Sequence, residues 1–407
     1  MKYIARELER KFDRLSGFFK AVLVTGARQV GKTTLLRHMA EGSGRAYVTL
    51  DDLRAREMAS RDPALFLQTW RPPVLIDEIQ KAPELLEQIK VACDGSDERG
   101  LFWLTGSQHF DMMRRVQETL AGRVGILKLY SFSQREKAGR PFAGELDFSF
   151  EGLMARGEGA PGGVVEVFRG IWEGGMPQVQ GVDEELRQEY LNSYVETYVM
   201  RDAVEAGGLK DTARFGRFLR ACAALVAQQV NLSTLAEGAG VSVPTARSWL
   251  DLLEGLGIVY LLPPFSNNAL RRLTKTPKLY FCDTGLCAFL SMWGAPETLM
   301  HGAASGHYYE NHVVMELARH YACSSARAAL SYYRDGNGRE IDLIVERDGL
   351  LHPLEIKKSA APAPQDVRKF EILDRAGLKR GPGGIVCLCE APLPIDRENC
   401  FIPGAAI

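Results

Sequence analysis

Short apolar runs separated by polar and amphipathic stretches mark the N-terminal third of the chain. Runs at residues 21–24, 74–76 and 101–104 are too short for helices and are bounded by charged, Gly or Pro residues, a pattern typical of buried strands. A further strand candidate at residues 46–50 lies between the first two runs. The alternation of strands with helical stretches predicts an α/β domain, which we expect to cover residues 1–135.

The remaining residues predict three further segments. A helical pattern over residues 183–205 dominates a connecting helical segment at 136–210. Residues 211–285 predict three or four short helices and a strand, and residues 286–407 predict a helix, three strands, a helix and a strand. A chain of 407 residues exceeds the size of one ordinary hydrophobic core. We therefore expect a multidomain α/β protein.

A glycine-rich loop with the spacing G-x-x-x-x-G-K-[ST] follows the first strand candidate. It comprises Gly26, Ala27, Arg28, Gln29, Val30, Gly31, Lys32, Thr33 and Thr34. The glycines allow successive backbone N–H groups to wrap a polyphosphate without Cβ clashes. Lys32 is expected to reach the β- and γ-phosphates and the Thr33 hydroxyl to bind Mg²⁺. The helix that starts at Lys32 directs its positive N-terminus at the same anion.

Paired acids, Asp77 and Glu78, end the second apolar run. Carboxylates at the end of a buried strand are costly unless they face a cation. We therefore assign Asp77 to Mg²⁺ and Glu78 to orienting and deprotonating the attacking water. The next strand ends in polar residues that predict a sensor for the γ-phosphate or the water; Ser107 is the first candidate, with Thr105 and Gln108 as alternatives. The three elements in this order predict a site for ATP and Mg²⁺.

Residues 231–253 carry the pattern of a helix-turn-helix. Ser233 is expected to cap the first helix, Gly240 permits the turn, and Ser242 with Pro244 starts the second helix. The strand pattern that follows completes the pattern of a winged helix, which predicts DNA binding by the second helix.

The charges of this segment leave two partner classes open. The second helix carries Asp251 and Glu254 but only Arg247 as a base, which favours docking of a protein. A basic patch at residues 266–278 contains Arg271, Arg272, Lys275 and Lys278 and no acid. The patch favours DNA, or else it forms a solvated wing of the domain.

Two C-terminal strands, joined by a tight turn, carry Asp342 and the triplet Glu355-Ile-Lys357. Strand alternation places Glu355 and Lys357 on one face. Two carboxylates and a lysine at one sheet edge are suited to metal-dependent phosphodiester hydrolysis, in which the acids hold Mg²⁺ and the lysine positions or deprotonates a water. The alternative is an ion-pair cluster on an inactive scaffold used for binding.

Nearly the whole chain resembles the bacterial and archaeal AAA-type P-loop ATPases that carry a winged-helix segment and a C-terminal domain of uncharacterised function. The resemblance rests on residues 26–34, 75–80, 104–107, 120–123, 278–285 and 340–357. It implies an AAA-type parallel-sheet domain (1–135), a helical winged-helix middle (211–285) and a restriction-endonuclease-like α/β domain (286–407). Glu310 would be the auxiliary acid of that last fold. Arg123 is the candidate for stabilising transition-state charge on the γ-phosphate, in cis or across a subunit interface.

Composition narrows the function classes. The formal net charge of −1 argues against a protein that binds polyanions over its whole surface. No apolar run approaches the ~18 residues of a membrane span, and the eight cysteines lack zinc-type spacing. We expect a cytoplasmic protein in which ATP hydrolysis controls a nucleic-acid-binding or nuclease-like C-terminal domain. The rival hypothesis is a slow ATP-dependent switch that binds a protein partner; the pattern does not specify the oligomeric state.

Overall fold

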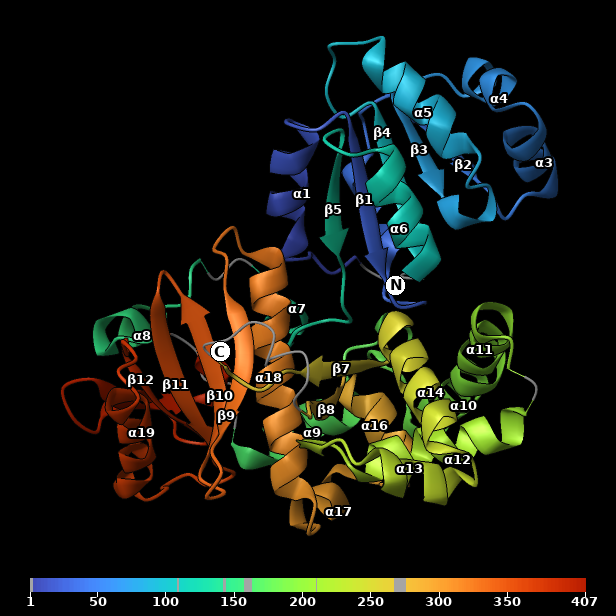
Figure 1. The fold of residues 1–407 in the computed structure, drawn as a ribbon. Coiled ribbons are helices and arrows are strands. Elements are labelled where there is room, and N and C mark those ends of the chain that lie inside the picture. The colour runs from blue at the N-terminus through green and yellow to red at the C-terminus, as the bar shows by residue number, and fades with distance from the viewer. Residues whose placement is uncertain (1–2, 108–109, 142–143, 157–162, 210, 267–275) are drawn as a thin grey trace. The chain divides into compact units, whose positions relative to one another are not determined.

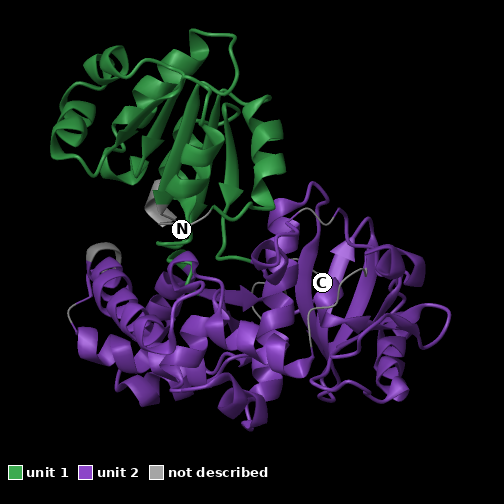
Figure 2. Cartoon of the chain, turned by 180° about the vertical axis from the view of Figure 1, so that it is seen from behind, with its two compact units in different colours: residues 1–132, 255–258 green, residues 133–254, 259–407 purple. Residues whose placement is uncertain are grey.

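The chain separates into two compact units in the computed structural model, which describes residues 3–407 apart from 108–109, 142–143, 157–162, 210 and 267–275. Unit 1 comprises residues 1–132 and 255–258, and unit 2 comprises residues 133–254 and 259–407 (Figure 2). Within the described ranges, every helix is too short or too polar to span a lipid bilayer.

Unit 1 is built on one parallel sheet with the strand order β2-β3-β4-β1-β5 (Figure 1). Its strands are β1 (Ala21–Gly26), β2 (Ala46–Thr49), β3 (Val74–Asp77), β4 (Phe102–Ser107) and β5 (Val124–Lys128). The strand β4 lies between β1 and β3, so the acids and the glycine-rich loop end strands that are not adjacent. The predicted parallel α/β domain is confirmed.

Helices cover both faces of this sheet, because its strands are apolar on both sides. They are α1 (Leu8–Ser16), α2 (Lys32–Met39), α3 (Leu53–Arg61), α4 (Pro63–Thr69), α5 (Leu85–Asp94) and α6 (Phe110–Thr119), with a 3-10 turn at Ile79–Lys81. The helix α1 packs on β1 and β5, whereas α2 packs on β1, β3 and β4. Leu23, Ile76 and Leu104 are fully buried between these layers.

The first half of unit 2 is mostly helical. Its helices are α7 (Gln134–Lys137), α8 (Phe150–Arg156), α9 (Val164–Glu173), α10 (Glu184–Tyr194), α11 (Met200–Gly207), α12 (Thr212–Ala224), α13 (Leu232–Ala239) and α14 (Val243–Gly255), with a 3-10 turn at Pro177–Val179 and a π-helical turn at Val195–Val199. The short strands β6 (Gln228–Gln229), β7 (Val259–Leu262) and β8 (Lys278–Phe281) form an antiparallel sheet of order β6-β8-β7.

The helix-turn-helix pattern of residues 231–253 corresponds to α13 and α14. Gly240 adopts the left-handed conformation (φ 70°) at the end of α13, as the turn requires. The predicted cap is wrong by two residues: Asn231, not Ser233, caps α13, and its side-chain oxygen accepts from the backbone N–H groups of Ser233 and Thr234. The amide side chain reaches both orphan donors from one position.

The second half of unit 2 contains a six-stranded sheet. Its elements are α16 (Thr284–Leu290), α17 (Pro296–His301), α18 (Ser305–Cys323), β9 (Ala329–Arg334), β10 (Glu340–Arg347), β11 (Leu350–Ile356), a 3-10 helix at Pro364–Phe370, α19 (Glu371–Arg375), β12 (Gly383–Cys387), β13 (Leu393–Pro394), β14 (Asn399–Pro403) and a 3-10 turn at Gly404–Ala406. The sheet order is β13-β14-β12-β11-β10-β9. The expected boundary between residues 285 and 286 falls inside α16.

Strand directions in this sheet follow from the connections. The pairs β9–β10 and β10–β11 are antiparallel, whereas β11–β12 is parallel, because a helical crossover joins those two strands. Asp348 and Gly349 both have positive φ (53° and 76°) in the tight β10–β11 turn. The helix α18 contacts both β8 and β11, so it connects the small sheet with the large one.

Candidate functional site

The glycine-rich loop joins β1 to α2 at the carboxyl end of the sheet. A Cβ atom on Gly26 would lie 2.1 Å from the carbonyl oxygen of Leu129, so only glycine fits there. Gly31, at the start of α2, has a left-handed backbone (φ 94°). Sequence reasoning missed a brace of this loop: the buried Arg6 donates to the carbonyl oxygens of Val30 (2.9 Å) and Tyr130 (2.6 Å).

Lys32 lies against the loop that precedes it. Its ammonium group donates to the carbonyl oxygens of Gly26 (3.0 Å) and Ala27 (2.8 Å), and the residue is only 6% exposed. These contacts hold the positive charge beside the loop and the N-terminus of α2. A polyphosphate in the loop would therefore meet both charges.

The two residues predicted to hold Mg²⁺ are in direct contact. The Thr33 hydroxyl donates to Oδ1 of Asp77 at 2.7 Å, and the Tyr47 hydroxyl donates to Oδ2 of Asp77 at 3.4 Å. A hydroxyl and a carboxylate oxygen are ligands that Mg²⁺ accepts. The donor set at this edge of the sheet therefore fits the ion.

Glu78 follows Asp77 in a left-handed conformation (φ 60°, ψ 46°), which is uncommon for a residue other than glycine. Its side chain is half-buried and accepts a hydrogen bond from the Gln80 amide. The backbone N–H of Glu78 donates to Oγ1 of Thr105 at 2.9 Å. Glu78 directly follows β3, at the carboxyl edge of the sheet where the glycine-rich loop also begins.

The three sensor candidates have different positions. Thr105 is fully buried and donates to Oδ1 of Asp77, so its hydroxyl is engaged by the acidic pair itself. Ser107 ends β4 and is paired in register with Gly26, which places its backbone beside the glycine-rich loop. Gln108 lies outside the described residues.

Arg123 is not brought to the glycine-rich loop of its own chain. It precedes β5, whose first residue pairs with Ala21 at the amino end of β1. The loop begins after Gly26, at the other end of the same strand, which is roughly 17 Å away at 3.3 Å per residue. The guanidinium binds both carboxylate oxygens of Asp94, at 2.6 and 2.9 Å.

The acids of the C-terminal sheet are held by lysines. Glu355 is 1% exposed, and its Oε1 accepts from the ammonium groups of Lys357 (2.8 Å) and Lys369 (2.6 Å). The contact with Lys357 agrees with the shared face expected from strand alternation. Lys369, from the 3-10 helix, was missed because the sequence gives no sign that this helix returns to the edge of β11.

One oxygen of Glu355 lacks a partner. Its Oε2 is buried without a hydrogen bond among the described residues. Asp342, on the neighbouring strand β10, accepts from the backbone N–H of Ile356 at 2.9 Å. Burial raises the pKa of Glu355, and the charge of Asp342 raises it further, which indicates that the two carboxylates are close.

Glu310 is engaged by two donors from β8. Its Oε1 accepts from the Lys278 ammonium (2.9 Å) and from the Tyr280 hydroxyl (2.7 Å). Lys278 also contacts Oε1 of Glu340 at 2.6 Å. Burial raises the pKa of Glu310 to about 7, against the opposing effect of the Lys278 ammonium.

The position of Lys278 corrects the predicted basic patch at residues 266–278. Lys278 is 4% exposed and ion-paired, so it belongs to the interior of unit 2 and not to an exposed patch. Acids from two other elements, α18 and β10, surround a lysine that local sequence placed on a surface loop. The other bases of the patch, Arg271, Arg272 and Lys275, lie outside the described residues.

Two further features concern possible ligands of unit 2. The exposed charged residues of α14 are Arg247, Asp251 and Glu254.

Among the described residues, no group of three or more His, Cys, Asp or Glu side chains is arranged to hold a metal ion. A divalent ion at the C-terminal edge would thus have two carboxylates, Asp342 and Glu355, which is a donor set that Mg²⁺ accepts together with water.

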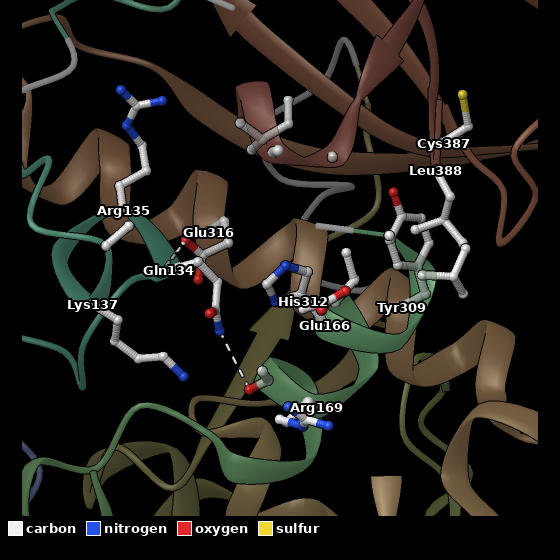
Figure 3. A pocket seen from close by; sticks show the side chains of 18 of the residues that line it. Gln134, Arg135, Lys137, Glu166, Arg169, Tyr309, His312, Glu316, Cys387 and Leu388 are labelled. Atoms are coloured by element: carbon white, nitrogen blue, oxygen red, sulfur yellow. Dashed lines mark hydrogen bonds between the residues drawn. The ribbon is translucent and has the colours of Figure 1, made fainter. Parts of the chain in front are cut away.

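A cavity of about 590 Å³ lies among α7, α9, α18 and the end of β12 (Figure 3). Three of its charged lining residues form ion pairs: Lys137 lies 3.6 Å from Glu173, and Glu316 lies 2.7 Å from Arg319. The ring of His312 enters it from α18, and burial lowers the pKa of this histidine to about 4. The sequence did not indicate the cavity, because its lining comes from distant segments.

The family comparison defines the class of the N-terminal unit. Residues 18–138 match the family model of an AAA domain. Together with the parallel sheet and the glycine-rich loop, this match makes the N-terminal part of the chain an AAA-type P-loop ATPase domain. Residues 166–297 and 305–407 match two domains of unknown function, DUF8612 and DUF4143.

The chain is also similar to whole proteins. Uncharacterized proteins of Mycobacterium tuberculosis and Mycobacterium bovis are each 28% identical over 387 residues, which is 95% of this chain and 80% of theirs. An uncharacterized protein of Haemophilus influenzae is 25% identical over 190 residues, 45% of this chain and 44% of that one.

Solved structures show more distant likenesses. A Walker-type ATPase of Pyrococcus abyssi has 16% identity and a TM-score of 0.45, over 71% of this chain and 96% of that one. The Holliday junction branch migration motor RuvB of Thermotoga maritima has 18% identity and a TM-score of 0.32, over 67% of this chain and 95% of that one. Both likenesses are too distant to bear on function.

Proposed function

We propose that unit 1 hydrolyses ATP and that its nucleotide state controls a nuclease-like centre at the Asp342–Glu355 edge of unit 2. The observation that carries the second half is the buried, unpartnered Oε2 of Glu355 beside Asp342. An orphaned carboxylate oxygen in the interior is unfavourable unless a cation or a proton reaches it.

The ATPase half follows from the contacts around the P-loop. The loop amides and Lys32 would bind the phosphates, and Thr33 and Asp77 would hold Mg²⁺, which would neutralise phosphate charge. Glu78 takes the proton of the attacking water, and Ser107 hydrogen-bonds the γ-phosphate or that water. Arg123 contributes only if it enters the site of a second copy of the chain.

The nuclease-like half is supported by topology as well as by side chains. The element order α18, β9, β10, β11, a helical crossover and β12 is the order expected for a restriction-endonuclease-like core. Asp342 and Glu355 would hold one divalent ion, which polarises the scissile phosphate when bound. Lys357 orients the attacking water, and Lys369 keeps the carboxylate of Glu355 in place.

The middle segment, residues 211–285, would be the part of the chain that binds a macromolecular partner. The order α12, β6, α13, α14, β7, β8 with a three-stranded sheet supports a winged helix. The exposed charges of α14 are one base and two acids, which is a poor match to a phosphate backbone. This observation favours the second candidate function, an ATP-dependent switch whose winged helix docks a protein partner.

The two functions are separated by a cleavage assay on the full chain. Single- and double-stranded DNA are incubated with Mg²⁺ or Mn²⁺, in the presence of ATP, ADP or no nucleotide. Wild type is compared with Lys357→Ala and with the control variant Arg375→Ala. The control removes an exposed ion pair between Arg375, the last residue of α19, and Glu371. Cleavage lost only in Lys357→Ala is the expected result; no cleavage by any preparation would favour the protein-docking switch.

A further inference from the structure

We propose that Glu310 and Glu340 form a second cation position beside the Asp342–Glu355 pair, and that the ammonium group of Lys278 fills it in place of a metal ion. The inference rests on the proposed nuclease-like function, since it concerns the same centre. Its consequence is a centre that uses one divalent ion, with a lysine of the middle segment as its fixed second cation.

The contacts of Lys278 are those of a bound cation. The ammonium lies 2.9 Å from Oε1 of Glu310 and 2.6 Å from Oε1 of Glu340. These acids come from different elements, α18 and β10. Tyr280, two residues further along β8 and therefore on the same face, donates to the same oxygen of Glu310 at 2.7 Å. Lys278 therefore links three elements, β8, α18 and β10, and its contacts differ from those of a chance ion pair on the surface.

Burial favours a cation at this position. The side chain of Lys278 is 4% exposed and that of Glu310 is 13% exposed. Two carboxylates brought together in such surroundings repel each other and lose hydration, so a cation between them favours the ionised form of both. A lysine of the same chain supplies that charge without the entropy loss of capturing an ion from solution.

The second cation position belongs to the proposed catalytic centre. Glu340 and Asp342 lie two residues apart on β10, and Asp342 accepts from the backbone N–H of Ile356, the residue after Glu355 on β11. The two acid pairs are therefore neighbours. His307 lies three residues before Glu310 on α18, so the two residues are on the same side of that helix.

Charge balance explains why one divalent ion suffices. With all four carboxylates (Glu310, Glu340, Asp342 and Glu355) ionised, the three ammonium groups (Lys278, Lys357 and Lys369) leave the cluster with one negative charge, and any proton on Glu310 or Glu355 reduces that excess. Arg334, at the solvent edge, lies 3.6 Å from the outer oxygen of Glu340. One divalent ion already reverses the sign of the cluster, and a second ion would meet net repulsion.

Counting bound Mn²⁺ tests the proposal. Full-length protein without nucleotide is titrated with Mn²⁺, followed by electron paramagnetic resonance of the free ion, in an Asp77→Asn background that removes the metal ligand of the P-loop. We expect one ion per chain in this background and two ions when Lys278→Met is added. Adding Glu340→Gln to Lys278→Met should return the count to the background value. Lys278→Arg keeps the charge and should also leave the count unchanged.

A stability measurement covers the case in which Lys278→Met folds poorly. With EDTA its melting temperature should fall, and millimolar Mn²⁺ should restore most of the loss, while Lys278→Arg should gain little from the ion. A Lys278→Met chain that stays unfolded with and without Mn²⁺ would overturn the proposal, as would an unchanged ion count.

If the Asp77→Asn background binds no Mn²⁺ but the same background with Lys278→Met binds one ion, the second cation position is supported and the nuclease-like centre of the proposed function fails.

Discussion

Replacing Thr105 with valine removes a buried hydroxyl while it nearly preserves the shape of the side chain. The hydroxyl donates to Oδ1 of Asp77 and accepts from the backbone N–H of Glu78 at 2.9 Å, and the residue is fully buried. The substitution therefore takes one donor from a carboxylate and leaves one N–H without a partner, inside the interior of unit 1.

The size of the effect follows from the two lost bonds. A hydrogen bond to a charged group contributes about 1.5–3 kcal/mol, and an unsatisfied buried donor costs about 1–3 kcal/mol. Asp77 keeps its bond from Thr33, at 2.7 Å, so we expect a net loss in the lower part of the summed range of about 2.5–6 kcal/mol, at about 3 kcal/mol. Thr105→Ser is the matched control, because it keeps the hydroxyl and loses one methyl group, worth about 1 kcal/mol.

Native-state hydrogen exchange of the β3 and β4 amides is the suitable assay, because a chain with two units does not unfold in one transition. A loss of about 3 kcal/mol accelerates exchange through unfolding about 100-fold. The Mg²⁺ requirement of ATP binding should also rise about tenfold, since Asp77 loses an orienting partner, while ATP binding in EDTA stays unchanged. A valine variant at least as stable as the serine variant, with an unchanged Mg²⁺ requirement, would refute the reasoning.

Three further predictions test the ATPase site and the cavity. Glu78→Gln should retain ATP binding, measured with a fluorescent nucleotide, but release phosphate at least about 100-fold more slowly; a smaller loss would mean that Glu78 is not the base. The Arg123→Gln variant, assayed as dilute enzyme, should keep the phosphate-release rate of wild type, because Asp94 holds Arg123 at the far end of the sheet. Loss of an arginine finger would instead lower the rate about thousandfold. A large loss at every protein concentration would contradict the placement of Arg123. The pKa of His312 is lowered from 6.5 to about 4 by burial, so the unfolded chain takes up a proton first and stability is lost as pH falls from about 6.5 to about 4, by about 3 kcal/mol in total. In urea titrations at several pH values His312→Gln should lack this slope, and an equal slope in both proteins would exclude His312 as its source.

Local sequence patterns were sufficient to predict the ATPase domain. The loop from Gly26 to Thr34, the acids Asp77 and Glu78, and the short apolar runs each report a local requirement: positive φ, phosphate geometry or burial on both faces of a strand. Their order along the chain then constrains the sheet, because parallel strands carry their functional loops at one edge. The contact between Thr33 and Asp77 was predictable for that reason.

The tertiary structure decided what depends on long-range pairing. No local pattern distinguishes Lys278, buried among acids from α18 and β10, from the bases of an exposed patch, because its partners are 32 and 62 residues away in sequence. The same holds for Lys369 on Glu355, for the brace that Arg6 provides to the P-loop, and for the cavity around His312. Electrostatic and desolvation energies depend on distance in space, and sequence separation carries little information about that distance. Sequence therefore determined which residues could do chemistry in this protein, whereas only the fold decided which charges neutralise one another.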